Sequence, residues 1–332
     1  MTMRMMVMGL VAGLMLTGCS QADEPSAAAS DDRLLVATTV SPLTSIAANI
    51  GGDLVQVEGI VPEGTNSHTF EPPPSAAGLL SDADLILVNG LKLEDPTLEL
   101  AEANKKPETE IVELGTEVLP ESEYIYDFSF PKEEGKPNPH LWTDPVHAGE
   151  YATLMAEKFS ALDPDNASAY EANLAAFLAK TKALADALVA DQASVPGGIK
   201  LVTYHDAYAY VGRRYGWEVV GAIQPSNFAE PTPSEVAALI DQVRAEDVSA
   251  IFGSEVFPSP VLEEIANEAG ATYIDDLRDD DLPGEPGDAE HSYLGLMRFD
   301  YVTMIEGLGG QAPALRALDV SDVAPDGATY PQ

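Results

Sequence analysis

The chain has 332 residues, of which 17 are Lys or Arg and 55 are Asp or Glu, so its formal net charge is −38 at pH 7. A surface this acidic repels nucleic acid and anionic lipid headgroups, which excludes both as expected ligands. It attracts cations, but diffuse charge steers an ion without selecting one. A selective cation site must therefore be argued from particular residues.

The first residues have the layout of a secretory signal peptide. Arg4 precedes an apolar run, and the run ends in L-T-G-C at Cys19, the only cysteine of the chain. The alternative, a short transmembrane anchor, would need ~20 apolar residues, which the run does not reach. Because L-T-G-C resembles the bacterial lipobox, we predict a signal peptide over residues 1–18 and lipidation of Cys19. The Ser/Ala/Asp-rich stretch after it, residues 19–32, is then a flexible tether.

Short apolar runs alternate with amphipathic stretches in two series, a pattern that indicates βαβ units and mostly parallel sheets. The first series predicts strands over 34–39, 55–61 and 85–89 and a helix over 42–49. The second predicts strands over 200–204, 218–222, 250–253 and 272–274, and helices over 207–215, 233–244 and 258–269. Between the series, residues 166–194 contain no Gly or Pro, which predicts one long helix within 163–193.

The fold class expected from this pattern is α/β, with two (β/α) lobes joined by a long helix. The expected divisions are an N-terminal lobe, the linking helix, a C-terminal lobe and a tail, over residues 33–162, 163–195, 196–315 and 316–332. A single helix is a stiffer connection than a Gly/Ser linker, so we expect small lobe movements rather than wide closure.

Three of the five histidines lie in turn-rich loops where a ligand site is expected. His68 follows the second predicted strand, His205 follows a strand of the second lobe, and His140 lies in a loop bracketed by prolines. Ligands of open α/β sheets bind beyond the carboxyl ends of strands. Asp275, the first polar residue after the last apolar pair, completes a His₃Asp set suited to zinc between the lobes.

Other residues are weighed against this set. Each histidine alone could be structural, and Asp275 alone could cap a helix. Glu71, Asp144 and Glu255 are candidates for orienting the imidazoles through their second ring nitrogen, and each could equally be a surface acid. The remaining histidines, His147 and His291, have no such setting and are expected on the surface.

The ordered motifs resemble the metal-binding solute-binding lipoproteins of bacterial ABC importers, which are zinc and manganese receptors. The motifs are N-S-H-T-F-E-P at 66–72, N-P-H-L-W-T-D-P at 138–145, Y-H-D-A-Y-A-Y-V-G-R-R-Y-G at 204–216, E-P-T-P-S-E-V at 230–236, F-G-S-E-V-F at 252–257, Y-I-D-D-L at 273–277 and S-Y-L-G-L-M-R-F-D at 292–300. The resemblance spans about 33–310. It implies that His68, His140, His205 and Asp275 bind a metal between two lobes.

The resemblance also implies a place in the cell and a partner. We expect a monomer on the outer face of a bacterial cell membrane, anchored to the bilayer through lipidated Cys19, that delivers its ion to a membrane permease. Three departures bear on the metal: Asn66-Ser67 replaces the usual Asp-Pro before the histidine, residues 121–139 contain no histidine, and the third ligand is His205 where manganese receptors often have glutamate. Imidazole favours Zn²⁺, and Mn²⁺ stays possible.

Two other classes are weighed. A secreted zinc hydrolase could use three histidines as ligands with Glu71 or Asp275 as base, but the chain has no H-E-x-x-H motif, so we do not expect an enzyme. A receptor for chelated iron or a corrin could use Tyr208, Tyr210, Arg213 and Arg214. For the metal receptor, three imidazoles with an ordinary pKa of ~6.5 predict an affinity that falls by up to about three decades per pH unit below that value.

Overall fold

The structure is a computed structural model that describes residues 33–127, 129–223, 231–254 and 259–331. Residues 33–332 form one compact unit, and residues 1–32 fall in a separate one. The predicted signal peptide, tether, Cys19 and Glu255 therefore lie outside the described residues. None of the helices in the described ranges is long and apolar enough to cross a membrane.

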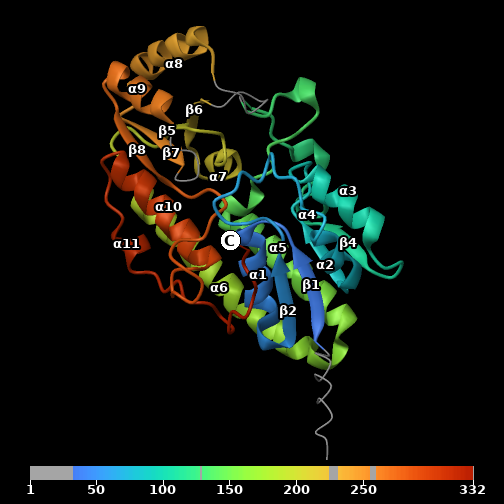
Figure 1. The fold of residues 1–332 in the computed structure, drawn as a ribbon. Helices are drawn as coiled ribbons and strands as arrows, with labels where there is room; N and C mark the ends of the chain where they lie inside the picture. Colours follow the sequence, from blue (N-terminus) through green and yellow to red (C-terminus); the bar gives the residue numbers. More distant parts are fainter. Residues whose placement is uncertain (1–32, 128, 224–230, 255–258, 332) are drawn as a thin grey trace, which may run out of the picture. The chain divides into compact units, whose positions relative to one another are not determined.

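The N-terminal part of the compact unit is built on a four-stranded parallel sheet in the order β2-β1-β3-β4 (Figure 1). Its strands are β1 (Leu34–Thr38), β2 (Val55–Gly59), β3 (Leu85–Val88) and β4 (Glu110–Glu113). Its helices are α1 (Ser41–Gly51), α2 (Ala76–Asp82), α3 (Asp95–Asn104) and α4 (Leu114–Val118). The strands are parallel because the helix between two consecutive strands carries the chain back to the edge of the sheet where the first strand began.

The C-terminal part repeats the same order as β6-β5-β7-β8, again with all strands parallel. Its strands are β5 (Lys200–Thr203), β6 (Glu218–Ala222), β7 (Ala250–Ser254) and β8 (Thr272–Leu277). Its helices are α7 (Ala209–Tyr215), α8 (Pro233–Ala245), α9 (Pro260–Ala269) and α10 (Tyr293–Gly307). The predicted α/β fold with two parallel sheets is confirmed.

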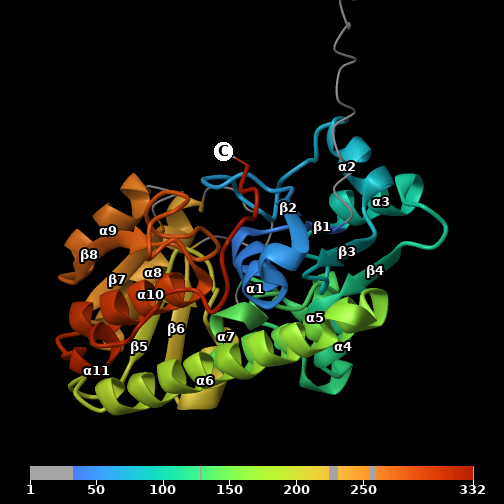
Figure 2. The ribbon, with the colours of Figure 1, turned by 90° about the horizontal axis from the view of Figure 1, so that it is seen from below.

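Two helices connect the sheets in sequence, α5 (Pro145–Leu162) and α6 (Ala167–Gln192). Figure 2 shows α6 running along both lobes. At 26 residues it is roughly 39 Å long. The predicted long helix is confirmed, and its buried face includes Phe177, Leu184 and Leu188.

The two sheets share one hydrophobic core. It contains Leu85 and Leu87 of β3 together with Leu201 of β5 and Phe252 of β7, packed with residues of α5, α6 and α10. The opposite faces have separate smaller clusters: Ile86 packs with residues of α2 and α3, whereas Ile251 packs with residues of α9. Because side chains alternate along a strand, each sheet is buried on both faces. The lobes are therefore joined by packing as well as by a helix.

The C-terminal segment returns to the N-terminal sheet after the short helix α11 (Pro313–Arg316). Thr329 forms a parallel bridge with Glu58 of β2. Its carbonyl accepts the N–H of Gly59 at 2.9 Å and its N–H donates to the carbonyl of Val57 at 2.9 Å. The tail thus pairs with the exposed edge of the sheet at β2.

Candidate metal centre

Local hydrogen bonds shape the loop that carries His68. The loop connects β2 to α2, and the side-chain oxygen of Asn66 accepts the N–H of His68 at 2.9 Å. An Asn that bonds the backbone two residues ahead makes a tight turn, which the residue types of this stretch favour. Ser67 beside it is buried, so the turn aims the His68 ring inward.

His140 is held by two asparagines. Asn89, the first residue after β3, donates its side-chain N–H to the carbonyl of Pro139 at 2.9 Å. Asn138 uses its amide nitrogen for Asp127 and for the carbonyl of Asp206, so its oxygen must face His140. That oxygen accepts the backbone N–H of His140 at 3.0 Å and its Nδ1–H at 2.9 Å. The Nε2 of His140 is therefore the nitrogen with a free lone pair.

His205 comes from the other lobe, two residues after the end of β5. The Thr203 hydroxyl donates to the His205 carbonyl at 2.7 Å and fixes the turn. The Nε2 of His205 lies 3.2 Å from the Nε2 of His140, and the Nε2 of His68 lies 3.1 Å from that same atom. The structure thus brings these three predicted residues together.

The spacing of the three imidazoles fits a transition metal. Their ligand atoms all lie within 4.8 Å of one another, and no other group of three or more His, Cys, Asp or Glu in the described residues does so. Two nitrogens bound tetrahedrally at about 2.0–2.1 Å from zinc would be about 3.3 Å apart. The observed separations of 3.1 and 3.2 Å are close to that value.

The three rings are also in the protonation state that a metal requires. Burial lowers the pKa of His205 to about 4. Burial, with a smaller contribution from the neighbouring imidazole of His205, holds the pKa values of His68 and His140 well below 6.5. All three are neutral near pH 7, so an ion can bind without displacing protons from them.

Asp275 is not part of this cluster, which corrects the prediction. Strand β8 continues to Leu277, three residues past the predicted end, because Leu277 pairs with Ser254 of β7. Asp275 consequently lies within the strand, with its side chain exposed. The loop after β8 instead brings Asp279 and Asp280 towards His205.

Asp280 is the better-placed carboxylate of the two. Its charge interacts with His205, and it accepts a hydrogen bond from the Ser67 side chain, next to His68. Burial raises its pKa to about 6. Asp279 lies farther back: one of its oxygens is 3.7 Å from Nδ1 of His205 and the other accepts the Tyr208 hydroxyl at 3.2 Å.

The structure places the three residues predicted to orient imidazoles in different surroundings. Glu71 is exposed, and Glu255 lies outside the described ranges. Asp144 is fully buried, but it accepts the N–H of Val146 at the start of α5 and forms an ion pair with Arg214. It therefore caps a helix rather than orienting one of the three histidines.

The prediction that His147 and His291 lie on the surface is wrong. His147 is buried and its Nδ1 lies 2.8 Å from a carboxylate oxygen of Glu150. His291 is buried against the ring of Tyr330, at a centroid distance of 4.8 Å. Tyr330 belongs to the C-terminal tail, so the sequence around His291 alone does not predict this contact.

The residues that sequence reasoning missed are mainly polar groups that hold the loops. Glu94 is buried, accepts the N–H of Asn89 at 2.7 Å and the hydroxyl of Thr39 at 2.7 Å, and so ties the ends of β1 and β3 together. Burial raises its pKa to about 7. Asn138 is the first residue of the motif N-P-H-L-W-T-D-P. Its position two residues before His140 was the sequence signal that could have identified it.

The tyrosines and arginines considered for a large chelate are engaged elsewhere, and Arg213 donates to the carbonyl of Glu123 at 2.9 Å. Tyr208 donates its hydroxyl to Asp300 at 2.9 Å, Tyr210 donates to the carbonyl of Asn138 at 3.0 Å, and Arg214 pairs with Asp144. Both tyrosines are buried. They support the loops of the site and do not line a space for a large ligand.

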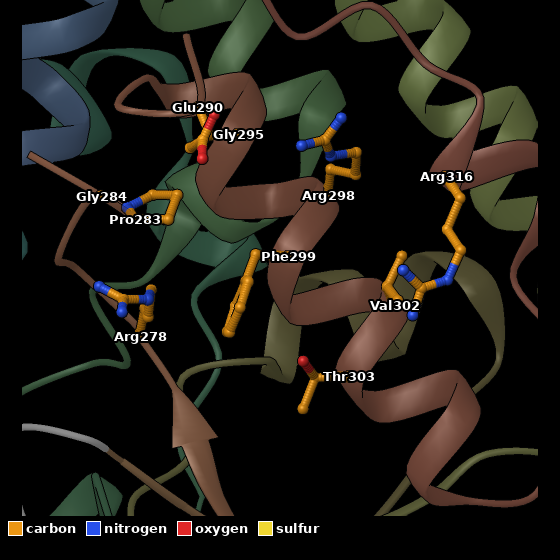
Figure 3. A pocket seen from close by; sticks show the side chains of 10 residues that line it. All are labelled: Arg278, Pro283, Gly284, Glu290, Gly295, Arg298, Phe299, Val302, Thr303 and Arg316. Atoms are coloured by element: carbon orange, nitrogen blue, oxygen red, sulfur yellow. The ribbon is translucent and has the colours of Figure 1, made fainter. Parts of the chain in front are cut away.

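A cavity of about 470 Å³ lies elsewhere, against α10. Its lining includes Arg278, Arg298 and Arg316, but none of the three clustered histidines. Figure 3 shows the side chains of Arg278 and Arg316 on opposite sides of α10. Arg316 is also paired with both carboxylate oxygens of Glu306, at 2.7 and 2.6 Å. These cations do not converge on one ligand.

Comparison with known proteins adds to this geometry. The model of the ZnuA family, described as zinc-uptake complex component A, periplasmic, matches residues 36–307. The chain belongs to this family. Its characterised relatives are metal-binding components of transporters and not enzymes.

Three relatives illustrate the range of the family. The manganese-binding lipoprotein MntA of Halalkalibacterium halodurans is 27% identical over 301 residues, 90% of this chain and 96% of that protein. The iron-binding protein YfeA of Yersinia pestis is 30% identical over 275 residues, 82% of this chain and 86% of that protein. The periplasmic zinc-binding protein TroA of Treponema pallidum has a solved structure that matches with a TM-score of 0.75 and 25% identity, over 83% of this chain and 99% of that one.

Proposed function

We propose that this protein is the receptor of an ABC importer: it captures a free divalent transition metal ion outside the cytoplasm and delivers it to the membrane permease. The observation that carries the proposal is the convergence of three neutral imidazoles, two from the N-terminal lobe and one from the C-terminal lobe, with Nε2 separations of 3.1 and 3.2 Å. Family membership supports the transport role.

We infer that the ligands are His68, His140, His205 and Asp280. Asp280 replaces Asp275 in this set, because its carboxylate interacts with His205 and bonds Ser67, whereas Asp275 is exposed in β8. Three neutral imidazoles and one carboxylate give a Zn²⁺ site a net charge near +1. The strongly acidic surface of the protein attracts such a cationic cargo.

Zn²⁺ is the favoured cargo and Mn²⁺ the second candidate. Three imidazole nitrogens are better ligands for zinc than for manganese, and the Irving–Williams order points the same way. The relatives described above include manganese-, iron- and zinc-binding proteins, so family membership does not select among these metals. The donor set is therefore the argument for zinc.

A zinc hydrolase is the weaker reading of the same residues. Catalytic zinc keeps a coordination position for water next to three protein ligands. With Asp280 as fourth ligand that position is filled, and the site binds and releases its ion. We further propose that the chain acts as a monomer, anchored to the outer face of the bacterial membrane through lipid on Cys19.

The test is a competition titration of purified protein with Zn²⁺ and Mn²⁺, together with elemental analysis of protein from its native host. His140→Ala should lower the Zn²⁺ affinity at least about 100-fold, and Asp280→Asn about 10- to 100-fold. Asp275→Asn is the matched control, because it removes an equal charge from the same segment, and it should bind as the unaltered protein does. Equal loss in both aspartate variants would refute Asp280 as a ligand, and a wild-type protein that binds neither ion would refute the receptor.

A further inference from the structure

His140 and His205 form a fixed pair although they come from different lobes. The segment 138–143 is bonded to the C-terminal lobe at several points: Asn138 donates to the carbonyl of Asp206 at 2.6 Å, Thr143 donates to the carbonyl of Ala207 at 2.9 Å and Trp142 donates to the carbonyl of Asp279 at 3.1 Å. All these groups are buried. The two imidazoles therefore cannot separate without breaking buried hydrogen bonds.

His68 is held in a different way. Its loop, residues 60–75, contains no helix or strand and contacts the C-terminal lobe. Where the loop meets that lobe, both carboxylate oxygens of Asp281 accept the N–H of Gly64, at 3.0 and 2.9 Å. Glu63 accepts the N–H of Leu282 at 3.3 Å in return. The loop is thus linked to that lobe by the exchange between residues 63–64 and 281–282 and, nearer to His68, by the hydrogen bond from the Ser67 side chain to Asp280.

The backbone conformation of Gly64 and the burial of Asp281 both restrict the hydrogen bond between these two residues. Gly64 has φ +73°, a conformation that glycine adopts without strain and that other residues rarely adopt. The Asp281 side chain is only 6% exposed, so its charge depends on donors such as this N–H. The bond lies four residues from His68 in one loop and directly beside Asp280 in the other.

We propose that Asp281 is a positioning residue for metal retention, a proposal that rests on the receptor function above. Asp281 does not reach the ion. It holds the loop of His68 against the C-terminal lobe, so that His68 closes on an ion already held by His140 and His205. When the Gly64–Asp281 bond breaks, only the Ser67–Asp280 bond still holds the loop near the site, so His68 is the first ligand to leave, and this step sets the rate at which the ion is released.

The experiment measures Zn²⁺ dissociation by stopped flow into an excess of a chromophoric chelator, with the full chain. Asp281→Ala should release Zn²⁺ about 10- to 100-fold faster, the loss expected for a hydrogen bond to a charged group. Asp281→Asn keeps an acceptor oxygen and should give a smaller increase. Asp276→Ala is the matched control, because Asp276 is an exposed carboxylate on β8, and its release rate should equal that of the wild type.

A double-mutant cycle separates positioning from general stability. In a His68→Ala background, where the positioned ligand is absent, adding Asp281→Ala should leave the dissociation rate unchanged within about twofold. If the two substitutions instead multiplied their effects on the dissociation rate, the proposal would be overturned. A wild-type dissociation rate in Asp281→Ala would overturn it as well. If Asp281→Ala does not fold, the same cycle with Asp281→Asn decides. Failure of the wild type to bind Zn²⁺ would instead count against the receptor function.

Discussion

At the scale of single residues, the site is characterised by imidazoles that stay neutral in acid. A solvent-exposed histidine titrates near pH 6.5. Burial places the pKa of His205 at about 4 and those of His68 and His140 well below 6.5. Asp280 has the opposite shift, to about 6, because burial disfavours its charged form. The carboxylate of Asp280 therefore takes up a proton at a higher pH than the imidazole of His205 as the pH falls.

This order changes the pH dependence expected from the sequence. Above about pH 6 Asp280 is ionised and the imidazoles are neutral, so the Zn²⁺ affinity should be nearly constant. As the pH falls through about 6, one proton competes with the ion at Asp280, and the affinity should begin to fall by about one decade per pH unit. The fall should steepen at lower pH as the histidines titrate, with His205 near pH 4.

Competition titrations at half-unit steps from pH 4.5 to pH 8 check this prediction. Asp280→Asn, which cannot titrate, should bind more weakly but with an almost flat profile down to about pH 5. A three-decade slope beginning near pH 6.5 in the wild type would show that the histidines have ordinary pKa values, as the sequence alone suggested.

The sequence could locate the three clustered histidines but not Asp280, the carboxylate proposed here as the fourth ligand. His68, His140 and His205 lie in loops that the turn-forming residues around each of them predict from the local sequence. Residues 275–281 contain five aspartates, and the choice among them depends on where β8 ends. That end is set by the pairing of β8 with β7, a tertiary contact, rather than by the apolar run.

At the scale of elements, the helix after His140 begins with a buried charge. Asp144 accepts the N–H of Val146 at 3.1 Å and pairs with Arg214 of α7, so it joins α5 to the C-terminal lobe. Burial raises the Asp144 pKa, and the hydrogen bond and charge of Arg214 oppose that rise. The residue is therefore a structural link between lobes and not a partner of the ion.

Asp144→Ala should accordingly reduce stability much more than binding. Loss of the cap and of a buried partner for Arg214 should lower the free energy of unfolding by about 2–4 kcal/mol. Asp144→Asn keeps the cap acceptor and should lose roughly half as much. Urea denaturation of the metal-free proteins measures the effect, and Glu157→Ala, an exposed carboxylate on α5 away from Asp144, is the control. Unfolding at the wild-type urea concentration in Asp144→Ala would contradict this role.

Elements with a strong local pattern were predicted from the sequence, and those that depend on distant partners were not. The predicted strand 218–222 matches β6, and the long helix lies within its predicted range. β4 was missed because its four residues E-I-V-E contain only two apolar side chains. The pairing of the tail with β2 was also missed, since Thr329 is about 270 residues from its partner in sequence.

At the scale of the whole molecule, the described body contains what metal binding needs. The shared core, α6 and the returning tail connect the two sheets. The exchange between residues 63–64 and 281–282 then closes the lobes at the site. Several links of this kind favour small adjustments around the ion rather than wide opening. All of these links lie within the described residues.

Attachment to the membrane is predicted to depend on Cys19, and metal binding is not. Cys19 ends the L-T-G-C motif that follows a signal-like apolar run, and this motif is the basis of the proposed attachment through lipid on Cys19. Cys19→Ala should move the protein from the membrane fraction to the soluble fraction while its Zn²⁺ affinity stays unchanged. Cell fractionation with labelled fatty acid measures attachment, and competition titration measures affinity. Ser20→Ala, one residue further on, is the control and should remain attached. A Cys19→Ala protein that stays with the membrane would place the anchor elsewhere, and one that loses affinity would show that the leader contributes to the site.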